Sequence, residues 1–496
     1  MKIDTDGTYT LQYTAVDSCG NETIEERTVI VASPRTVLYT DGTFIINEKP
    51  EDQAANIAAH GAATNVYDAF DPNGSTDAKK YVFVFTDSRP WYGQRGRIKS
   101  VEIGQDISPY ETQYWFDGCS ALTSCNFNGL DTSGVTNMRD MFNRCQVLAN
   151  LDLSVFDTSA VTDMHRMFGR CYALTGLDLS NFNTSKVTNM GNMFEYCEAL
   201  TSLNVSNFDT SAVTTMSNMF TSCRNLTSLD VSNFNTSKVT AMNNMFEKCV
   251  KLTSLDVSNF DTSNVGNMYF MFEECQNLTS LDLSNFNTNK VTAMNNMFDG
   301  CFKLASLDVS NFDTSNVTNM ANMFNSCYVL TGLDVSGFNT SNVTNMQCMF
   351  SGCNALTSLD VSGFNASKVM NMQEMFARCI KLTTLDLSNF NAGVVTNMRE
   401  MFFNCTKLTS LDFSSFDTSR VTNMYYMFSG CSALTTIYAS LSFVVDQVTN
   451  SADMFGSNNH LVGGAGTAYS SSNPRDKTYA HIDGGTADPG YFTAKP

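Results

Sequence analysis

Long apolar runs and basic residues are both scarce in this 496-residue sequence. No apolar run approaches the roughly 18 residues that a membrane-spanning helix needs, so we expect no insertion into a membrane. Asp and Glu number 49 against 30 Lys and Arg, which gives a formal net charge of −19 at pH 7. Proteins that bind DNA or RNA need a basic surface, and because this sequence offers none, nucleic acid is excluded as a partner.

Sequence motifs of catalysis are also lacking. The four histidines, His60, His165, His460 and His481, lie in different regions, and their spacing suggests no metal site. No nucleophile elbow, phosphate-binding loop or dinucleotide fingerprint is found. Carboxylates are plentiful, which keeps a glycosidase-type pair formally open, but they recur in every repeat whereas a catalytic pair is needed once. We therefore expect a protein that is not an enzyme and needs no cofactor.

The beginning of the sequence has no secretory signal. The first residues, MKIDTDGTYT, lack both the positive n-region and the apolar h-region of a signal peptide. We expect either that the chain is not secreted by that route or that it is a piece of a longer protein.

What the sequence does have is a strict period. Thirteen of its 16 cysteines follow one another at intervals of 26 residues: Cys119, Cys145, Cys171, Cys197, Cys223, Cys249, Cys275, Cys301, Cys327, Cys353, Cys379, Cys405 and Cys431. A fixed period of this size indicates a solenoid in which each repeat is one coil that packs on the next. The length of the chain, too great for one hydrophobic core, agrees with a repeat array.

Each repeat combines two periodicities. Its first half, as in Leu151, Leu153 and Phe156, alternates like a short half-buried strand. Its second half spaces Val187, Met190, Met193-Phe194 and Cys197 like one face of a helix about ten residues long, with Thr184 or Ser185 as N-cap. A short Val-Thr-Asn-Met strand followed by one helical turn is the alternative. The fold class that we predict is an α/β repeat solenoid of about 13 coils, with a short helix or a mixed back.

Apolar positions recur because neighbouring coils bury them against copies of themselves. The methionine stripe could suggest a soft-metal site, but at this spacing it is typical of core filling. The cysteines are spaced so that their Cβ vectors run parallel, which suits a disulfide poorly, so we expect them to be buried and reduced.

We divide the chain into four parts: residues 1–34, a partial β hairpin with strands at 8–16 and 26–31; 35–121, an N-terminal cap with an irregular first coil; 122–456, the repeats; and 457–496, a C-terminal cap. In the N-terminal cap we predict a hairpin whose turn, Asp41-Gly42, is of type I′, an Ala-rich helix near 51–62 and a strand at 81–85. Caps are needed because an open end of a repeat array exposes its core.

A polar position at the centre of the predicted strand recurs through the array and is here named the Asp ladder. Its residues are Asn126, Asp152, Asp178, Asn204, Asp230, Asp256, Asp282, Asp308, Asp334, Asp360, Asp386, Asp412 and Tyr438. Carboxylates about 5 Å apart repel each other, so raised pKa values, hydrogen bonds from Ser or bound cations must offset the repulsion. Three alternatives stay open: a solvated face, weak Ca²⁺ binding for which Asp230, Asp256, Asp282, Asp308, Asp334 and Asp360 are the candidates, and a regular face that matches a polysaccharide or ice lattice.

Variation between repeats concentrates near Met-Phe and Cys in the second half of the unit. Aromatic residues there are Tyr172, Tyr196, Tyr269, Phe270, Phe302, Tyr328, Tyr425 and Tyr426. We expect some of them to pack between coils and the others to contact a partner, because exposed aromatic residues favour interfaces.

The repeated LTSLDVSNFDTSNVTNM and MF-x-x-C motifs resemble the 26-residue bacterial surface-protein repeat of the BspA-like leucine-rich-repeat group, over residues 98–455. The resemblance implies a right-handed leucine-rich-repeat superhelix with strands on the concave side, and a role in adhesion or host contact on the bacterial surface. Similar modules occur in phage-encoded proteins. Residues 1–34 resemble the last hairpin of a bacterial Ig-like domain. The sequence differs from such surface proteins in lacking a lipobox and a wall-sorting tail.

These observations predict a non-enzymatic extracellular protein, an adhesin or displayed binding module. Its expected partner is a host or bacterial surface protein or glycan, and the chain itself is expected to be a monomer. Two other functions stay open: a structural spacer or stalk on the cell surface, and a tail-associated receptor-binding protein on a phage particle.

Overall fold

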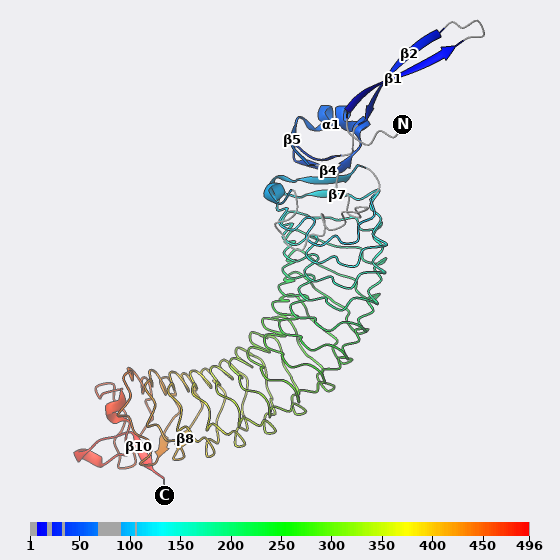
Figure 1. Cartoon of the computed structure of the whole chain (residues 1–496). Coiled ribbons are helices and arrows are strands. Elements are labelled where there is room, and N and C mark those ends of the chain that lie inside the picture. Colours follow the sequence, from blue (N-terminus) through cyan, green and yellow to red (C-terminus); the bar gives the residue numbers. More distant parts are fainter. Residues whose placement is uncertain (1–6, 17–21, 32–34, 68–90, 105–106, 496) are drawn as a thin grey trace.

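The computed structural model describes residues 7–16, 22–31, 35–67, 91–104 and 107–495. It has the shape of a long, curved stack of coils, with a β hairpin at the N-terminal end and short strands and turns at the C-terminal end (Figure 1). No helix in these described residues is long and apolar enough to cross a membrane.

Regular secondary structure is concentrated before the coils. The elements in chain order are β1 (Gly7–Val16), β2 (Glu22–Val31), β3 (Arg35–Tyr39), β4 (Thr43–Glu48), η1 (Pro50–Asp52), α1 (Gln53–His60), β5 (Ala63–Tyr67), η3 (Tyr92–Arg97) and β6 (Ser100–Ile103). β1 and β2 pair antiparallel, and β2 begins four residues earlier than the expected strand. The helix expected near 51–62 forms as α1, whereas the strand expected at 81–85 lies outside the described residues.

The hairpin of β3 and β4 has a different turn from the one expected. A type I′ turn needs positive φ at both central residues, but Gly42 has a φ of 98° and Asp41 is not in the left-handed region. The Gly42 N–H donates to the Tyr39 carbonyl at 3.2 Å, and the Thr43 N–H donates to the Asp41 carboxylate at 2.8 Å. The loop is therefore a three-residue one that ends with Gly42 in the left-handed region.

The N-terminal cap is joined to the coils by a continuous sheet. The strand order is β5-β3-β4-β6-β7, where β7 is Ser124–Asn126. β4 pairs parallel with β6, and β6 pairs parallel with β7. Because each parallel pair joins one layer of the stack to the next, the cap covers the first coil with hydrogen-bonded backbone.

The second half of each repeat is a series of turns rather than a helix. In the coil of Cys171, every second N–H donates to a carbonyl of the next coil, namely those of Met164, Arg166, Phe168 and Arg170. The N–H groups of Met167 and Gly169 donate to carbonyls three residues back, and that of His165 donates to the Asp163 carboxylate. Arg166 and Arg170 have φ values of 52° and 60°. Left-handed residues recur at the same two places in the other coils. In each coil the backbone N–H groups therefore point alternately to the next coil and back into the same coil.

The reason that no helix forms is the spacing of the coils. Stacked Phe rings of neighbouring coils, from Phe116 to Phe455, have centroids 5.6–5.9 Å apart. An α-helix with its side chains is about 10 Å wide and uses its N–H groups internally. Helices therefore do not fit at this spacing, and the prediction of a ten-residue helix is wrong. The alternative of a short strand before a turn comes closer, because parallel bridges run through Asn137, Asp163 and Asn189 up to Asn450.

The predicted strands of the first half mostly lack a hydrogen-bonded ladder. β7, β8 (Ser410–Phe413) and β9 (Thr436–Ala439) are the only strands formed at these positions in residues 107–495, and one further bridge joins Ser202 to Ser228. Elsewhere in this range, no backbone hydrogen bond joins the Leu-Asp-Val segments of successive coils. We expected the strand ladder of the array in the Leu-Asp-Val segments. The parallel bridges run instead through the Val-Thr-Asn segments. The placement of the strands on the concave side stays a prediction.

A buried threonine ladder joins the coils between these two segments. Thr158 is 1% exposed, and its hydroxyl donates to the Asn183 carbonyl at 2.9 Å and accepts from the Asn183 N–H at 2.8 Å. One hydroxyl thus satisfies two backbone groups of the next coil, which would otherwise cost free energy when buried.

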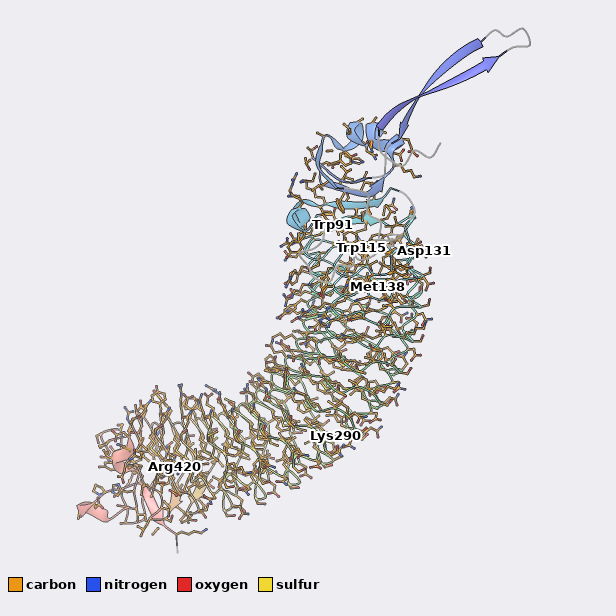
Figure 2. All side chains as sticks on the ribbon, in the orientation of Figure 1. Trp91, Trp115, Asp131, Met138, Lys290 and Arg420 are labelled. Carbon is orange, nitrogen blue, oxygen red and sulfur yellow. The ribbon has the colours of Figure 1, made fainter. Side chains whose placement is uncertain are left out.

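Apolar side chains fill the interior along the whole stack (Figure 2). The recurring Leu, Phe, Val, Met and Cys side chains form one continuous core that reaches from Leu38 in the cap to Phe492. Phe298, in the middle of the array, has no exposed surface and stacks on Phe272 and Phe324 at 5.8 and 5.7 Å.

The C-terminal end is closed by one additional strand. β10 (Phe492–Ala494) pairs parallel with β9, which pairs with β8, so the chain returns to add a layer beyond the last coils. Two short 3-10 helices, η4 (Lys477–Tyr479) and η5 (Gly485–Ala487), precede it. The Asp483 carboxylate accepts N–H groups from Ala465, Thr467 and Gly485 at 2.9 Å each and so holds these turns together.

The cysteine ladder consists of thiols that donate to backbone. Each Sγ from Cys145 to Cys431 lies 3.0–3.3 Å from the carbonyl oxygen of the Phe 29 residues earlier. The 14 cysteines from Cys125 to Cys431 are free thiols. Burial raises the pKa of the Cys171 thiol to about 12, which keeps it protonated and unreactive at neutral pH.

We predict that Phe298→Ala lowers the free energy of unfolding by about 3–5 kcal/mol, because it leaves a cavity in the stack. Since coils interact with their nearest neighbours, hydrogen exchange should rise mainly in the coils on either side. The half-buried Phe302 gives the matched control, and Phe302→Ala should cost much less. A uniform change of exchange along the array would contradict the stacking.

For the cysteines we predict that the native protein labels poorly with a thiol reagent, because the thiols are buried and protonated. After denaturation without reductant, nearly all 16 should label. The idea of buried thiols would fail if most sites stayed blocked until a reductant was added.

Candidate functional site

Most coils change direction at three Asx turns, in which an Asp or Asn side chain accepts the N–H two residues on. The third position is Thr215, Ala241 and Ala293 in three of the coils. In one coil, Asp178 accepts from Ser180 at 3.0 Å, Asn183 from Ser185 at 3.1 Å and Asn189 from Gly191 at 3.0 Å. These side chains recur at intervals of 26 residues and give the coil its corners. The Asp ladder is the first of the three positions.

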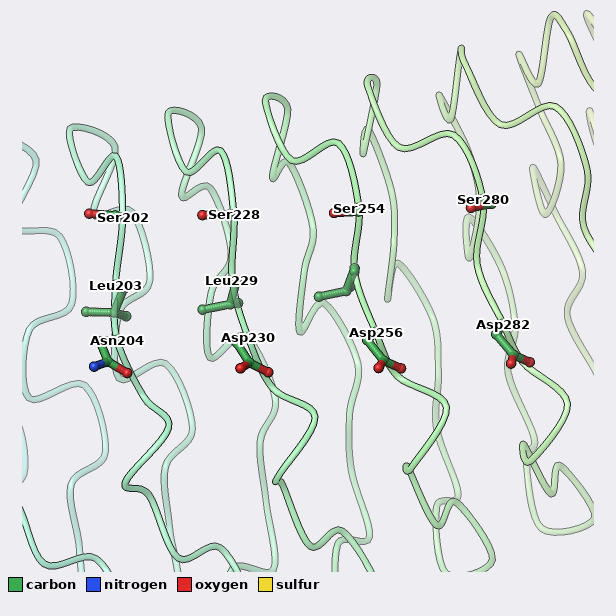
Figure 3. A pocket seen from close by; sticks show the side chains of 11 residues that line it. Ser202, Leu203, Asn204, Ser228, Leu229, Asp230, Ser254, Asp256, Ser280 and Asp282 are labelled. Atoms are coloured by element: carbon green, nitrogen blue, oxygen red, sulfur yellow. The ribbon is translucent and has the colours of Figure 1, made fainter.

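The Asp ladder lies on one exposed face of the array, with Asp230, Asp256 and Asp282 in a row beside the serines and leucines of the same strands (Figure 3). Oδ1 of Asp230 accepts the Ser232 N–H at 3.0 Å and its hydroxyl at 2.7 Å. These hydrogen bonds lower the pKa of Asp230, as the bonds from Ser310 lower the pKa of Asp308. Hydrogen bonds from serine therefore offset part of the repulsion, and the pKa values of Asp230 and Asp308 are lowered rather than raised.

A shallow groove runs across the coils on this face. Its volume is about 640 Å³, and it is lined by the Ser-Leu-Asp segments of successive coils: Ser202, Leu203, Asn204, Ser228, Leu229, Asp230, Ser254, Leu255, Asp256, Ser280 and Asp282. Among these segments the backbone forms one bridge, from Ser202 to Ser228, and no continuous strand ladder. The lining of the groove combines leucine side chains, serine hydroxyls and carboxylates.

The Ca²⁺ candidates of the Asp ladder contribute one carboxylate per coil. Asp230, Asp256 and Asp282 lie along a line rather than around a point (Figure 3). In the part of the chain that the structure describes, no group of three or more His, Cys, Asp or Glu side chains is arranged to hold a metal ion. Ca²⁺ prefers six to eight oxygen ligands, so a single rung is a poor cage. Binding of Ca²⁺ to the ladder stays a prediction.

The variable residues lie on the turns that replace the predicted helix, and this surface is here named the turn face. The face has two left-handed positions per coil, one before Met-Phe and one before Cys. Asn192, Asn218, Asn244, Asn296 and Asn322 occupy the first, and Gly300, Gly352 and Gly430 occupy the second. Asn and Gly adopt this conformation most easily, so their recurrence was a signal for turns that the helical spacing of Met and Phe concealed.

The predicted aromatic residues form four separate pairs on the turn face. Tyr172 and Tyr196 have ring centroids 6.4 Å apart, Tyr269 and Phe270 5.4 Å, Phe302 and Tyr328 5.0 Å, and Tyr425 and Tyr426 4.2 Å. Tyr172 and Tyr328 are 38% and 41% exposed, whereas the other six are half-buried. The structure therefore brings the eight residues together two by two, and each pair offers a ring surface to solvent.

Arginines lie over rings of two of these pairs, and they were not among the predicted site residues. The Arg170 guanidinium lies 5.7 Å from the centroid of the Tyr196 ring, and that of Arg399 lies 5.3 Å from Tyr425. Lys248 contacts the carboxylates of Glu247 at 2.5 Å and Glu273 at 3.2 Å. Arginines that lie over aromatic rings are typical of interfaces. The half-buried Arg170 and Arg399 therefore belong to the same surface as the aromatic pairs.

Asp140 is a buried carboxyl group at the N-terminal end of the turn face. It is 4% exposed and has a φ of 54°. Burial raises its pKa to about 6, and the nearby Asp117 adds to this shift, although Arg139 lies 3.2 Å away and opposes it. At neutral pH the Asp140 carboxyl group is therefore ionised, although its burial in the fold favours the protonated form.

We predict that Asp140→Asn stabilises the protein at pH 7.5 relative to the parent, by on the order of 1 kcal/mol, and loses this advantage at pH 4. The folded pKa is raised, so the parent loses stability as pH rises through about 6, and the neutral variant does not. Urea unfolding at both pH values measures the difference. The exposed Asp157, whose pKa is lowered by Ser159, is the control, and Asp157→Asn should show the opposite trend.

Comparison with known families gives a match along the coils. The family described as "Mycoplasma protein of unknown function, DUF285" matches residues 110–203, 197–301, 276–359 and 353–464. No curated protein matches the chain. The four matched segments follow one another along the coils and together cover well over half of the sequence, and the chain therefore belongs to the DUF285 repeat family.

Proposed function

We propose that the chain is a non-enzymatic binding module displayed outside the cell, an adhesin on a BspA-like leucine-rich-repeat solenoid. The sequence resemblance supports the solenoid class, and the division of each coil into constant and variable parts supports binding. The interior residues, the Asx turns and the threonine ladder recur with little change, so they serve the stacking of coils. Surfaces that differ from coil to coil suit recognition of a partner by its shape.

The observation that carries this proposal is the set of aromatic pairs on the turn face. Phe302 and Tyr328 come from adjacent coils and stack with an interplanar angle of 15°, and Tyr328 keeps 41% of its surface exposed. Burial of these rings is not needed for stacking of the coils, because the continuous Phe column already fills the interior. Exposed aromatic surface of this kind favours contact with a protein or a sugar ring.

A structural spacer is the second candidate. The length of the stack, closed at each end by strands that continue it, supports this function (Figure 1). A spacer needs no ligand, so the two functions differ in whether the chain itself binds to cells.

We predict that replacing Tyr269, Phe270, Phe302 and Tyr328 together by Ser weakens binding of the chain to bacterial or host cells at least about tenfold, because aromatic anchors supply most of the energy of such interfaces. Binding of the labelled protein is measured by flow cytometry. The melting temperature should change by no more than a few degrees, since these side chains lie outside the core.

The control variant replaces two exposed residues away from these pairs, Tyr110 at 64% and Leu441 at 89% exposure, by Ser. It should bind like the parent. If the parent binds no cell type, the spacer is favoured. If binding survives in the aromatic variant, the assignment of the turn face is wrong.

A further inference from the structure

The three Asx turns of a coil do the same structural work but differ in charge. An Asx turn needs a single side-chain oxygen, which Asn supplies as well as Asp. At the second turn the chain uses both residues: Asn183, Asp209, Asn235, Asp261, Asn287, Asp313, Asn339, Asn365, Asn391 and Asp417. At the third turn it uses mostly Asn.

The Asp ladder departs from this mixture. From Asp230 to Asp412, eight consecutive coils carry Asp at the first turn. Like charges on neighbouring coils repel, and alternation with Asn would relieve the repulsion without loss of the turn. The Asx turn therefore explains why one side-chain oxygen is needed at each of these positions. It does not explain why the residue is the charged Asp rather than Asn.

The charge is also left without partners inside the chain. At the second turn, Lys238 and Arg420 approach Asp209 and Asp417 closely enough to lower their pKa values. Among the described residues, the one cation paired with the Asp ladder is Lys495, which contacts Asp412. The residues from Asp230 to Asp386 in the ladder are exposed, and the hydrogen bonds of their Asx turns use Oδ1.

The contact of Lys495 shows how a cationic side chain occupies the ladder. Its Nζ lies 2.5 Å from Oδ2 of Asp412, while Oδ1 of the same carboxylate still accepts the Ser414 N–H at 2.9 Å. Lys495 comes from beyond the array, and it shares a recess of about 370 Å³ with Asp386, Asp412 and Tyr438. An ammonium group thus binds the free oxygen of a rung without disturbing the Asx turn.

We propose that the Asp ladder is a docking surface for an extended lysine- and arginine-rich segment of a partner protein. Each basic side chain binds the free Oδ2 of one rung, as Lys495 does on Asp412. The apolar stems of the basic residues lie along the leucines of the groove. This site is independent of the aromatic pairs on the turn face.

The spacing of the coils fits such a segment. Coils are 5.6–5.9 Å apart at the Phe rings. Alternate side chains of an extended strand are roughly 6.7 Å apart. A peptide with a basic residue at every second position therefore places one charge near each rung.

The test is binding of a fluorescein-labelled 12-residue Lys-Ser alternating peptide to the full chain, measured by fluorescence anisotropy in 50 mM NaCl. The ladder variant carries Asp256→Asn, Asp282→Asn and Asp308→Asn. The matched control carries Asp209→Asn, Asp261→Asn and Asp313→Asn, which remove the same charge at the second turn and keep the same type of hydrogen bond. Melting temperatures establish that both variants are folded.

We expect the ladder variant to bind the peptide about tenfold more weakly than the parent and the control to bind within about twofold of it, because each removed rung loses one charge-assisted contact. Equal weakening of both variants would show that only net charge attracts the peptide and would overturn the proposal. Absence of binding to the parent would do the same.

Two further arms distinguish the mode of binding. A peptide of the same composition with its lysines in one block should bind more weakly, and equal binding would overturn the extended arrangement. CaCl₂ should displace the peptide only as strongly as NaCl of equal ionic strength. Displacement at much lower ionic strength would identify the ladder as a divalent-cation site instead.

Discussion

Backbone hydrogen bonding between neighbouring coils, along the turns of the second half of each repeat, is the interaction on which the rest of this structure depends. Every second N–H is turned outward to the next coil, as those of Met164 and Phe168 are, and the two left-handed residues per coil make this alternation possible. The spacing that results stacks the Phe rings, buries the methionines and sets each thiol against a carbonyl. None of the described non-glycine residues in the left-handed region is β-branched, in agreement with the steric cost of that conformation.

The same spacing divides the surface into two faces with different properties. On the turn face the side chains between the hydrogen-bonded positions are free to vary, and there the chain presents aromatic pairs and ion pairs. In the first half of the repeat, the Leu-Asp-Val segments of most coils are not joined by backbone bonds, and this face carries a groove and a row of carboxylates. A diverse face suits recognition of a shape, whereas a monotonous charged face suits a repetitive cationic partner.

Membership of the DUF285 family connects the repeat to a group described only as of unknown function. The geometry therefore has to supply the functional argument. The aromatic pairs support an adhesin and the Asp ladder supports docking of a basic segment, and both use side chains that stacking of the coils does not require.

The sequence by itself determined the period, the number of coils, the buried positions and the polar positions, because each of these depends only on which residue recurs every 26 places. The eight aromatic residues could likewise be chosen from their variation between repeats. Only the tertiary structure decided that Val187 to Cys197 form turns rather than a helix, because the distance between coils is set by contacts that span 25 or more residues. It also decided the pairing of Phe302 with Tyr328 and of Lys495 with Asp412, which are 26 and 83 residues apart, since no local pattern encodes the packing of side chains from different layers.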